Sequence, residues 1–179
     1  MKGELFMGLD YSIELNITDK KTGIAGACYE IAYWRKHYAL RSETMRVVEE
    51  STAFIQQDDD YRIVATTDAI PVLIEYLGKA LADRESDIFS YALWDHRMAR
   101  IITVRQLARL CAWDSLLCEI ENIKTITDLN EREEAIDGIL GDILDEIDYY
   151  EDEPISEKLK DFLVHAEDYD FTIEIINSY

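Results

Sequence analysis

The sequence predicts an α+β fold that is mostly helical and contains a small sheet. Apolar and polar residues alternate over 9–18 and again over 171–175, the period of two that is typical of half-buried strands. Between these ends, apolar residues recur mostly at helical spacing, and only 2 prolines and 7 glycines interrupt the chain. We therefore expect N-terminal, central and C-terminal strands to form one antiparallel or mixed sheet.

The first third of the chain is expected to contain two strands and a helix. Residues 9–18 form the first strand, with Tyr11 among its inward side chains, and 19–23 form a turn. The spacing over 25–53 predicts one long or one broken helix. Residues 56–60 are expected to interrupt it, and 61–66 predict the central strand.

The middle of the chain is expected to be helical. Asp68 is a candidate N-cap for a helix that ends near residue 82, and a further segment covers 86–97. Thr103 and Gln106 have the spacing of a capping box for the apolar helix 104–123, which we expect to be the buried centre of the fold.

A second amphipathic helix follows from residue 128. Asp128 and Glu131 have capping-box spacing, and Pro154 is expected to begin a short last helix before the terminal strand. The apolar stripe of the amphipathic helix consists of Ile136, Ile139, Leu140, Ile143, Leu144 and Ile147.

Charge is the most unusual property of the sequence. The net charge is −20, and residues 130–179 hold 17 acidic residues against 3 Lys+Arg. We expect a single domain over 1–179, in which 128–179 is a strongly acidic C-terminal subregion. Direct binding to nucleic acid or to an anionic membrane is not expected, because both need a cationic face.

The acidic residues of this subregion are placed against the stability of their helix. Carboxylates near the helix C-terminus oppose the helix dipole, and like charges three or four residues apart repel. Two interpretations stay open: an ordinary solvated acidic face, or a surface shaped for a cationic partner. The candidate partner-binding residues are Glu131, Glu134, Asp142, Asp145, Asp148, Glu151, Asp152 and Glu153.

No catalytic or metal-binding motif is apparent, so we expect no enzyme activity, no cofactor and no metal site. Asp58, Asp59 and Asp60 are consecutive but lack the spacing of a calcium-binding loop. The three cysteines form no CxxC pair, and we expect Cys111 and Cys118, seven residues apart in an apolar helical run, to be buried thiols.

The remaining charged and aromatic residues have two open interpretations each. Four arginines precede or lie within the central helix, where they could bind an anion or pair with the acidic helix; they are Arg97, Arg100, Arg105 and Arg109. The tryptophans Trp34, Trp94 and Trp113 are expected to lie in the core rather than to stack on a ligand.

Two short motifs, Met-Gly-Leu-Asp at 7–10 and Ala-Tyr-Trp-Arg-Lys at 32–36, resemble small uncharacterised proteins of phages and bacteria. The resemblance covers roughly 7–42 and implies a phage or mobile-element origin without an activity. In composition, the acidity is similar to that of phage anti-restriction and anti-CRISPR proteins.

From these observations we expect a non-enzymatic inhibitor that binds a basic nucleic-acid-handling host protein, such as a CRISPR effector, and competes with DNA or RNA. One alternative is a phage accessory module that binds a protein without mimicry, and another is a small carboxylate-based hydrolase. The first ten residues lack the apolar core of a signal peptide, so a cytoplasmic location is expected.

Overall fold

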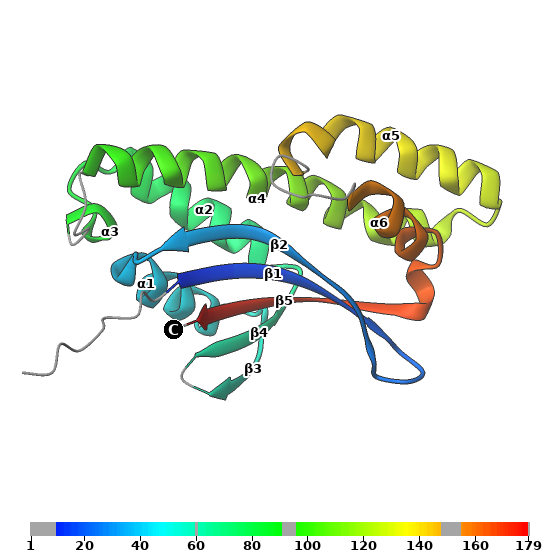
Figure 1. Ribbon diagram of the computed structural model, residues 1–179, viewed down its shortest axis with the longest axis horizontal. Coiled ribbons are helices and arrows are strands. Elements are labelled where there is room, and N and C mark those ends of the chain that lie inside the picture. The colour runs from blue at the N-terminus through cyan, green and yellow to red at the C-terminus, as the bar shows by residue number, and fades with distance from the viewer. Residues whose placement is uncertain (1–9, 60, 91–95, 148–154, 179) are drawn as a thin grey trace, which may run out of the picture.

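The computed structural model describes residues 10–59, 61–90, 96–147 and 155–178. The fold is α+β, as predicted: a five-stranded antiparallel sheet in the order β2-β1-β5-β4-β3, with helices packed against it (Figure 1). The long helix α4 contacts β2, and α2 and α5 both pack on α4. The N-terminal, central and C-terminal segments all contribute strands, which confirms the predicted origin of the sheet.

The sheet begins with a hairpin of β1 (Asp10–Asp19) and β2 (Ala25–Arg35). At the turn, the Asp19 carboxylate accepts the backbone N–H groups of Lys21 and Thr22 at 2.9 and 2.8 Å. Gly23 follows with a φ of 68°, a conformation that favours glycine. The predicted strand and turn are therefore confirmed.

The expectation of a helix beginning at residue 25 is wrong, because this segment is β2. The pairing register shifts within the hairpin: Ala32 lies opposite Ile13 and Glu30 lies opposite Glu14, which leaves Ile31 as an extra residue. The bulge buries Ile31 and Ala32 in succession. Consecutive burial removes the period of two, so the strand resembled a helix in sequence.

The C-terminal strand lies at the centre of the sheet. Strand β5 (Tyr169–Ser178) pairs with β1 on one side and with β4 (Arg62–Thr66) on the other, so β4 confirms the predicted central strand. The predicted break at 56–60 is wrong, since β3 (Phe54–Asp59) pairs with β4. Strand β3 is an edge strand exposed from Phe54 to Asp58, and without a buried face it shows no alternation.

Three shorter helices come before α4: α1 lies between the hairpin and β3, and α2 and α3 follow β4. Helix α1 (Tyr38–Glu49) is capped by His37, whose Nδ1 accepts the Leu40 N–H at 3.3 Å. Helix α2 (Ala69–Ala82) has the predicted bounds, although the Asp68 side chain makes no capping hydrogen bond. Helix α3 (Asp87–Ser90) is a single turn.

Helix α4 (His96–Thr125) is one continuous helix of 30 residues. The predicted capping box at Thr103 is wrong, because Thr103 lies inside the helix and donates its hydroxyl to the Ala99 carbonyl at 2.8 Å. Gln106 instead accepts the backbone N–H of Tyr33 at 3.0 Å and joins the helix to β2. A Thr followed three residues later by Gln has the spacing of a capping box even when, as here, the threonine hydroxyl bonds a carbonyl of its own helix.

The amphipathic helix α5 (Leu129–Ile147) packs on α4 and α6 (Ile155–Val164), and a 3₁₀ turn (Ala166–Asp168) leads into β5. The Asp128 carboxylate accepts the N–H groups of Asn130 and Glu131 at 2.9 and 3.0 Å, which confirms the predicted N-cap. Ile136, Leu140 and Ile143 of the stripe are buried and Ile139 is partly buried. The side chains of Leu144 and Ile147, and the whole of Pro154, fall outside the described residues.

Aromatic contacts join the sheet to the helices in the core. The rings of Tyr29 and Trp113 lie 5.9 Å apart, and those of Tyr11 and Trp34 lie 5.5 Å apart. The Tyr11 hydroxyl is hydrogen bonded to Thr44, and burial raises the Tyr11 pKa well above its usual value. Trp34 and Trp113 are therefore core residues, as predicted, while Trp94 lies outside the described residues.

Candidate functional site

The predicted acidic surface is present where the structure describes it, on the outer face of α5. Glu131, Glu134 and Asp142 are exposed, and no described side chain pairs with any of them. The side chain of Asp145 is outside the described residues, as are Asp148, Glu151, Asp152 and Glu153 in full. We call Glu131, Glu134 and Asp142 the α5 carboxylates.

Two other exposed carboxylates of the same helix, Glu133 and Asp137, lie near a lysine. Lys160 of α6 lies 2.7 Å from the Asp137 carboxylate and 4.0 Å from that of Glu133. These neighbouring carboxylates raise the pKa of Lys160, and the hydrogen bond that Lys160 donates to Asp137 has the largest effect. Helix α5 thus carries two kinds of exposed carboxylate: Glu133 and Asp137, which lie near Lys160, and the α5 carboxylates, which have no partner among the described residues.

Two glycines lie between the α5 carboxylates. From Glu131, the helical positions three, seven and ten residues on are Glu134, Gly138 and Gly141, so all four share the outer face. A Cβ built on either glycine meets no atom within 4 Å. Packing inside the protein therefore does not require glycine at these two positions.

The prediction that the arginines of α4 neutralise the acidic helix is wrong for Arg100 and Arg109. Arg109 is buried, lies 3.8 Å from the Glu30 carboxylate and donates to the Glu30 carbonyl at 3.1 Å. Arg100 donates to the carbonyls of the segment that follows α2. Arg97 and Arg105 are exposed on the first turns of α4, whereas α5 begins close to the opposite end of that helix (Figure 1).

A different arginine holds the acidic helix in place. Arg132 is 5 % exposed, although its neighbours in the sequence are the exposed residues Glu131 and Glu133. Its guanidinium donates to the carbonyls of Ile126 and Val164 at 2.8 and 2.6 Å and forms an ion pair with Glu167 at 2.9 Å. Arg132 is the only Lys or Arg in the sequence from 127 to 157. It joins α5 to Ile126 before the helix and to Val164 and Glu167 after it.

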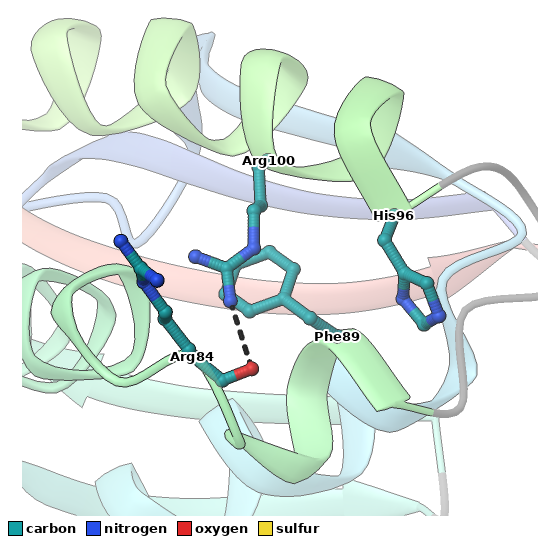
Figure 2. A pocket seen from close by; sticks show the side chains of 4 residues that line it. All are labelled: Arg84, Phe89, His96 and Arg100. Carbon is teal, nitrogen blue, oxygen red and sulfur yellow. Dashed lines mark hydrogen bonds between the residues drawn. The ribbon is translucent and has the colours of Figure 1, made fainter.

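A second candidate site lies at the other end of α4, and no single stretch of sequence indicated it. An open pocket of about 360 Å³ is lined by Arg84, Phe89, His96 and Arg100 (Figure 2). The Arg100 guanidinium lies over the Phe89 ring, 4.4 Å from its centre. The four residues come from the segment after α2, from α3 and from the start of α4. Their sequence spacing therefore gave no signal.

The prediction that Cys111 and Cys118 are buried is wrong, because both are exposed free thiols, as is Cys28. Cys111 and Cys118 lie on the solvent side of α4, where apolar content alone had suggested burial. Desolvation and a hydrogen bond to the Glu14 carboxylate, 3.0 Å away, raise the pKa of Cys28 to about 12. Such a thiol is a weak nucleophile at neutral pH.

Among the described residues, no group of three or more histidine, cysteine, aspartate or glutamate side chains could hold a metal ion. Asp58 of the predicted aspartate run lies in β3, 3.6 Å from Arg62, which also pairs with Glu174.

Within the described part of the chain, no helix is both long and apolar enough to span a membrane. Comparison of the chain with protein-family models, with curated proteins and with solved structures finds no match.

Proposed function

We propose that this protein is a non-enzymatic inhibitor of the phage type that binds a basic, nucleic-acid-handling host protein through the outer face of α5. The partner class is a CRISPR effector or another nucleic-acid enzyme of the host cytoplasm, and binding competes with its DNA or RNA. The observation that carries the proposal is the exposed position of the α5 carboxylates, which have no partner among the described residues.

The contrast along α5 argues against a purely solubilising role. A solvated helix face needs polar residues but does not need one sign of charge, and like charges at this spacing cost a few tenths of a kcal/mol per pair. Lys160 of α6 shows that a cation can pair with carboxylates of α5. The outer face lacks a comparable cation among the described residues.

The two exposed glycines support a surface made for close contact. Each glycine costs up to about 1 kcal/mol relative to alanine in a helix interior. Because Gly138 and Gly141 have open space around them, the benefit that offsets this cost lies outside the fold. Without side chains at these positions, a partner can approach the α5 backbone between Glu134 and Asp142.

The spacing of the charges fits a single strand better than a duplex. Along α5, Glu131 and Glu134 lie about 4.5 Å apart and Asp142 lies about 12 Å further on, whereas duplex DNA offers about one charge per 1.7 Å of its axis. A single acidic helix therefore copies the phosphate track of one strand. We expect the partner surface to be a groove that binds one strand of nucleic acid.

The test is capture of the partner from a host lysate by the full chain and by two variants of equal charge. The first variant, Glu134→Gln with Asp142→Asn, removes two α5 carboxylates. The second, Glu49→Gln with Glu85→Gln, removes two exposed carboxylates elsewhere. We expect the first variant to bind at least tenfold more weakly, which is about 1.4 kcal/mol, and the control to bind as the wild type does. Equal binding by both variants would overturn the proposal.

One observation favours the alternative of an accessory module without mimicry. Met98, Ile101 and Val104 on the first turns of α4 are 48, 40 and 55 % exposed, which is high for large apolar residues on one helix face. A partner bound there would be held by apolar burial and would resist salt. Mimicry predicts that binding falls steeply with salt, since exposed charges are screened within about 8 Å at physiological ionic strength.

A further inference from the structure

We propose that the pocket formed by Arg84, Phe89, His96 and Arg100 binds the phosphate group of a small organic phosphate. This site lies at the α3 end of the molecule, away from the α5 carboxylates, and it does not depend on the proposed inhibitor function (Figures 1 and 2).

The first argument is the uncompensated charge of Arg100. Its guanidinium donates to the carbonyls of Leu81, Asp83 and Arg84 at 3.1 to 3.3 Å, and Phe89 lies against one face of it. These contacts fix its orientation but supply no negative charge. Arg132 is held by carbonyls in the same way and also has the Glu167 carboxylate, whereas no described carboxylate lies within ion-pair distance of Arg100.

The second argument is the position of Arg84. Figure 2 shows its side chain alongside that of Arg100 on the same side of the pocket, and no described side chain pairs with it. Two guanidinium groups that share a pocket repel each other unless an anion lies between them. Arginine is also the side chain whose planar donors best match phosphate oxygens.

Neighbouring acidic residues do not fill this role. Asp83 and Glu85 flank Arg84 in the chain, and the Asp83 carboxylate accepts the Glu85 backbone N–H at 3.0 Å, which stabilises the turn after α2. Asp87 begins α3, and neither it nor Glu85 lines the pocket. Among the described residues, the lining of the pocket is therefore cationic in a chain whose net charge is −20.

The size of the pocket defines the ligand class. A volume of about 360 Å³ is at the lower end of the range for small-molecule sites, about 300–1,000 Å³, and exceeds what one phosphate ion fills. The stems of the two arginines supply apolar contact for an attached organic group, while the buried Phe89 ring supports Arg100 from below. Two permanent cations also match the charge of a phosphate monoester, about −1.5 to −2 at pH 7, better than that of a single carboxylate.

The experiment is calorimetric titration of the full chain at pH 7.5 with adenosine 5′-monophosphate as the probe, and with adenosine and inorganic phosphate as comparisons. We expect the monophosphate to bind, adenosine to bind at least tenfold more weakly, and inorganic phosphate to bind more weakly than the monophosphate. Equal binding of adenosine would show that phosphate is not recognised. Equal binding of inorganic phosphate would show that the organic group adds nothing, and either result would overturn the proposal.

Two arginine variants localise the site. Arg84→Ala removes an exposed side chain without a structural partner, so the fold should be retained, and binding should fall at least tenfold. Arg105→Ala is the matched control, because it removes the same charge from an exposed position on α4 outside the pocket. Absence of binding by the wild type at millimolar probe, or equal losses in the two variants, would contradict the proposal.

Discussion

The two halves of α4 carry surfaces of opposite character. Over its C-terminal half, α5 and α6 pack on one side of the helix (Figure 1), and the α5 carboxylates lie on the exposed face of α5. Over its N-terminal half, Met98, Ile101 and Val104 remain exposed and Arg84 and Arg100 line a pocket. The net charge of −20 therefore does not describe the surface at the start of α4, which is apolar and cationic. The two surfaces need separate tests.

The largest expected effect is the loss of stability when a buried side chain of α5, which packs on α4, is truncated. Ile143→Ala should lower the free energy of unfolding by about 2–5 kcal/mol, because Ile143 is 6 % exposed and lies between α5 and its neighbours. Ile101→Ala on the open half should cost less than about 1 kcal/mol, since Ile101 is 40 % exposed. Urea unfolding of both variants measures the difference, and similar losses would mean that both halves are covered.

The next effect concerns the arginines at the two ends. Arg132→Ala should cost about 2–3 kcal/mol, because it removes the donors to the buried Val164 carbonyl and the partly buried Ile126 carbonyl. Arg100→Ala should cost less, since Arg100 is only partly buried and its carbonyl partners reach solvent more easily.

Glu167→Gln serves as the control for the ion pair itself. The Glu167 side chain is 53 % exposed, so its charge should contribute no more than about 1 kcal/mol. Thermal unfolding of the three variants orders these effects. A larger loss from Glu167→Gln than from Arg132→Ala would show that charge, not carbonyl satisfaction, holds α5 in place.

A smaller effect of opposite sign is expected at the glycines. Gly138→Ala should stabilise the free protein by about 0.4–1 kcal/mol, because alanine favours the helix and open space surrounds the site. Gly78→Ala in α2 has the same open surroundings and should stabilise by a similar amount. Only Gly138→Ala should weaken partner binding, and a loss of stability on this substitution would indicate that the outer face of α5 is packed.

The sequence predicted the fold where one face of an element is buried and regular. Alternation predicted β1 and β4, and the stripe of Ile136, Leu140 and Ile143 predicted the buried face of α5. It failed at β2, where a bulge removes the alternation, and at β3, where no side-chain face is buried. The spacing of apolar residues along one segment cannot reveal a bulge or an edge strand, because both depend on how the neighbouring strand pairs.

The candidate sites were predictable to different degrees for the same reason. The α5 carboxylates lie on one helix, so helical spacing placed Glu131, Glu134 and Asp142 on one exposed face. The pocket residues meet only after α2, α3 and α4 pack, so spacing could not unite Arg84 with Arg100. The partners of Arg100 and Arg109 were also unpredictable, since they lie in loops and strands distant in sequence.

The measurement that tests the central claim most directly is the unfolding free energy of the Glu134→Gln, Asp142→Asn variant. If these carboxylates are kept for a partner, their removal relieves like-charge repulsion, and stability should be unchanged or raised by a few tenths of a kcal/mol. We expect this unchanged or raised stability together with a tenfold loss of partner binding. A stability loss of more than about 1 kcal/mol would contradict it, because it would show that the carboxylates are paired within the fold.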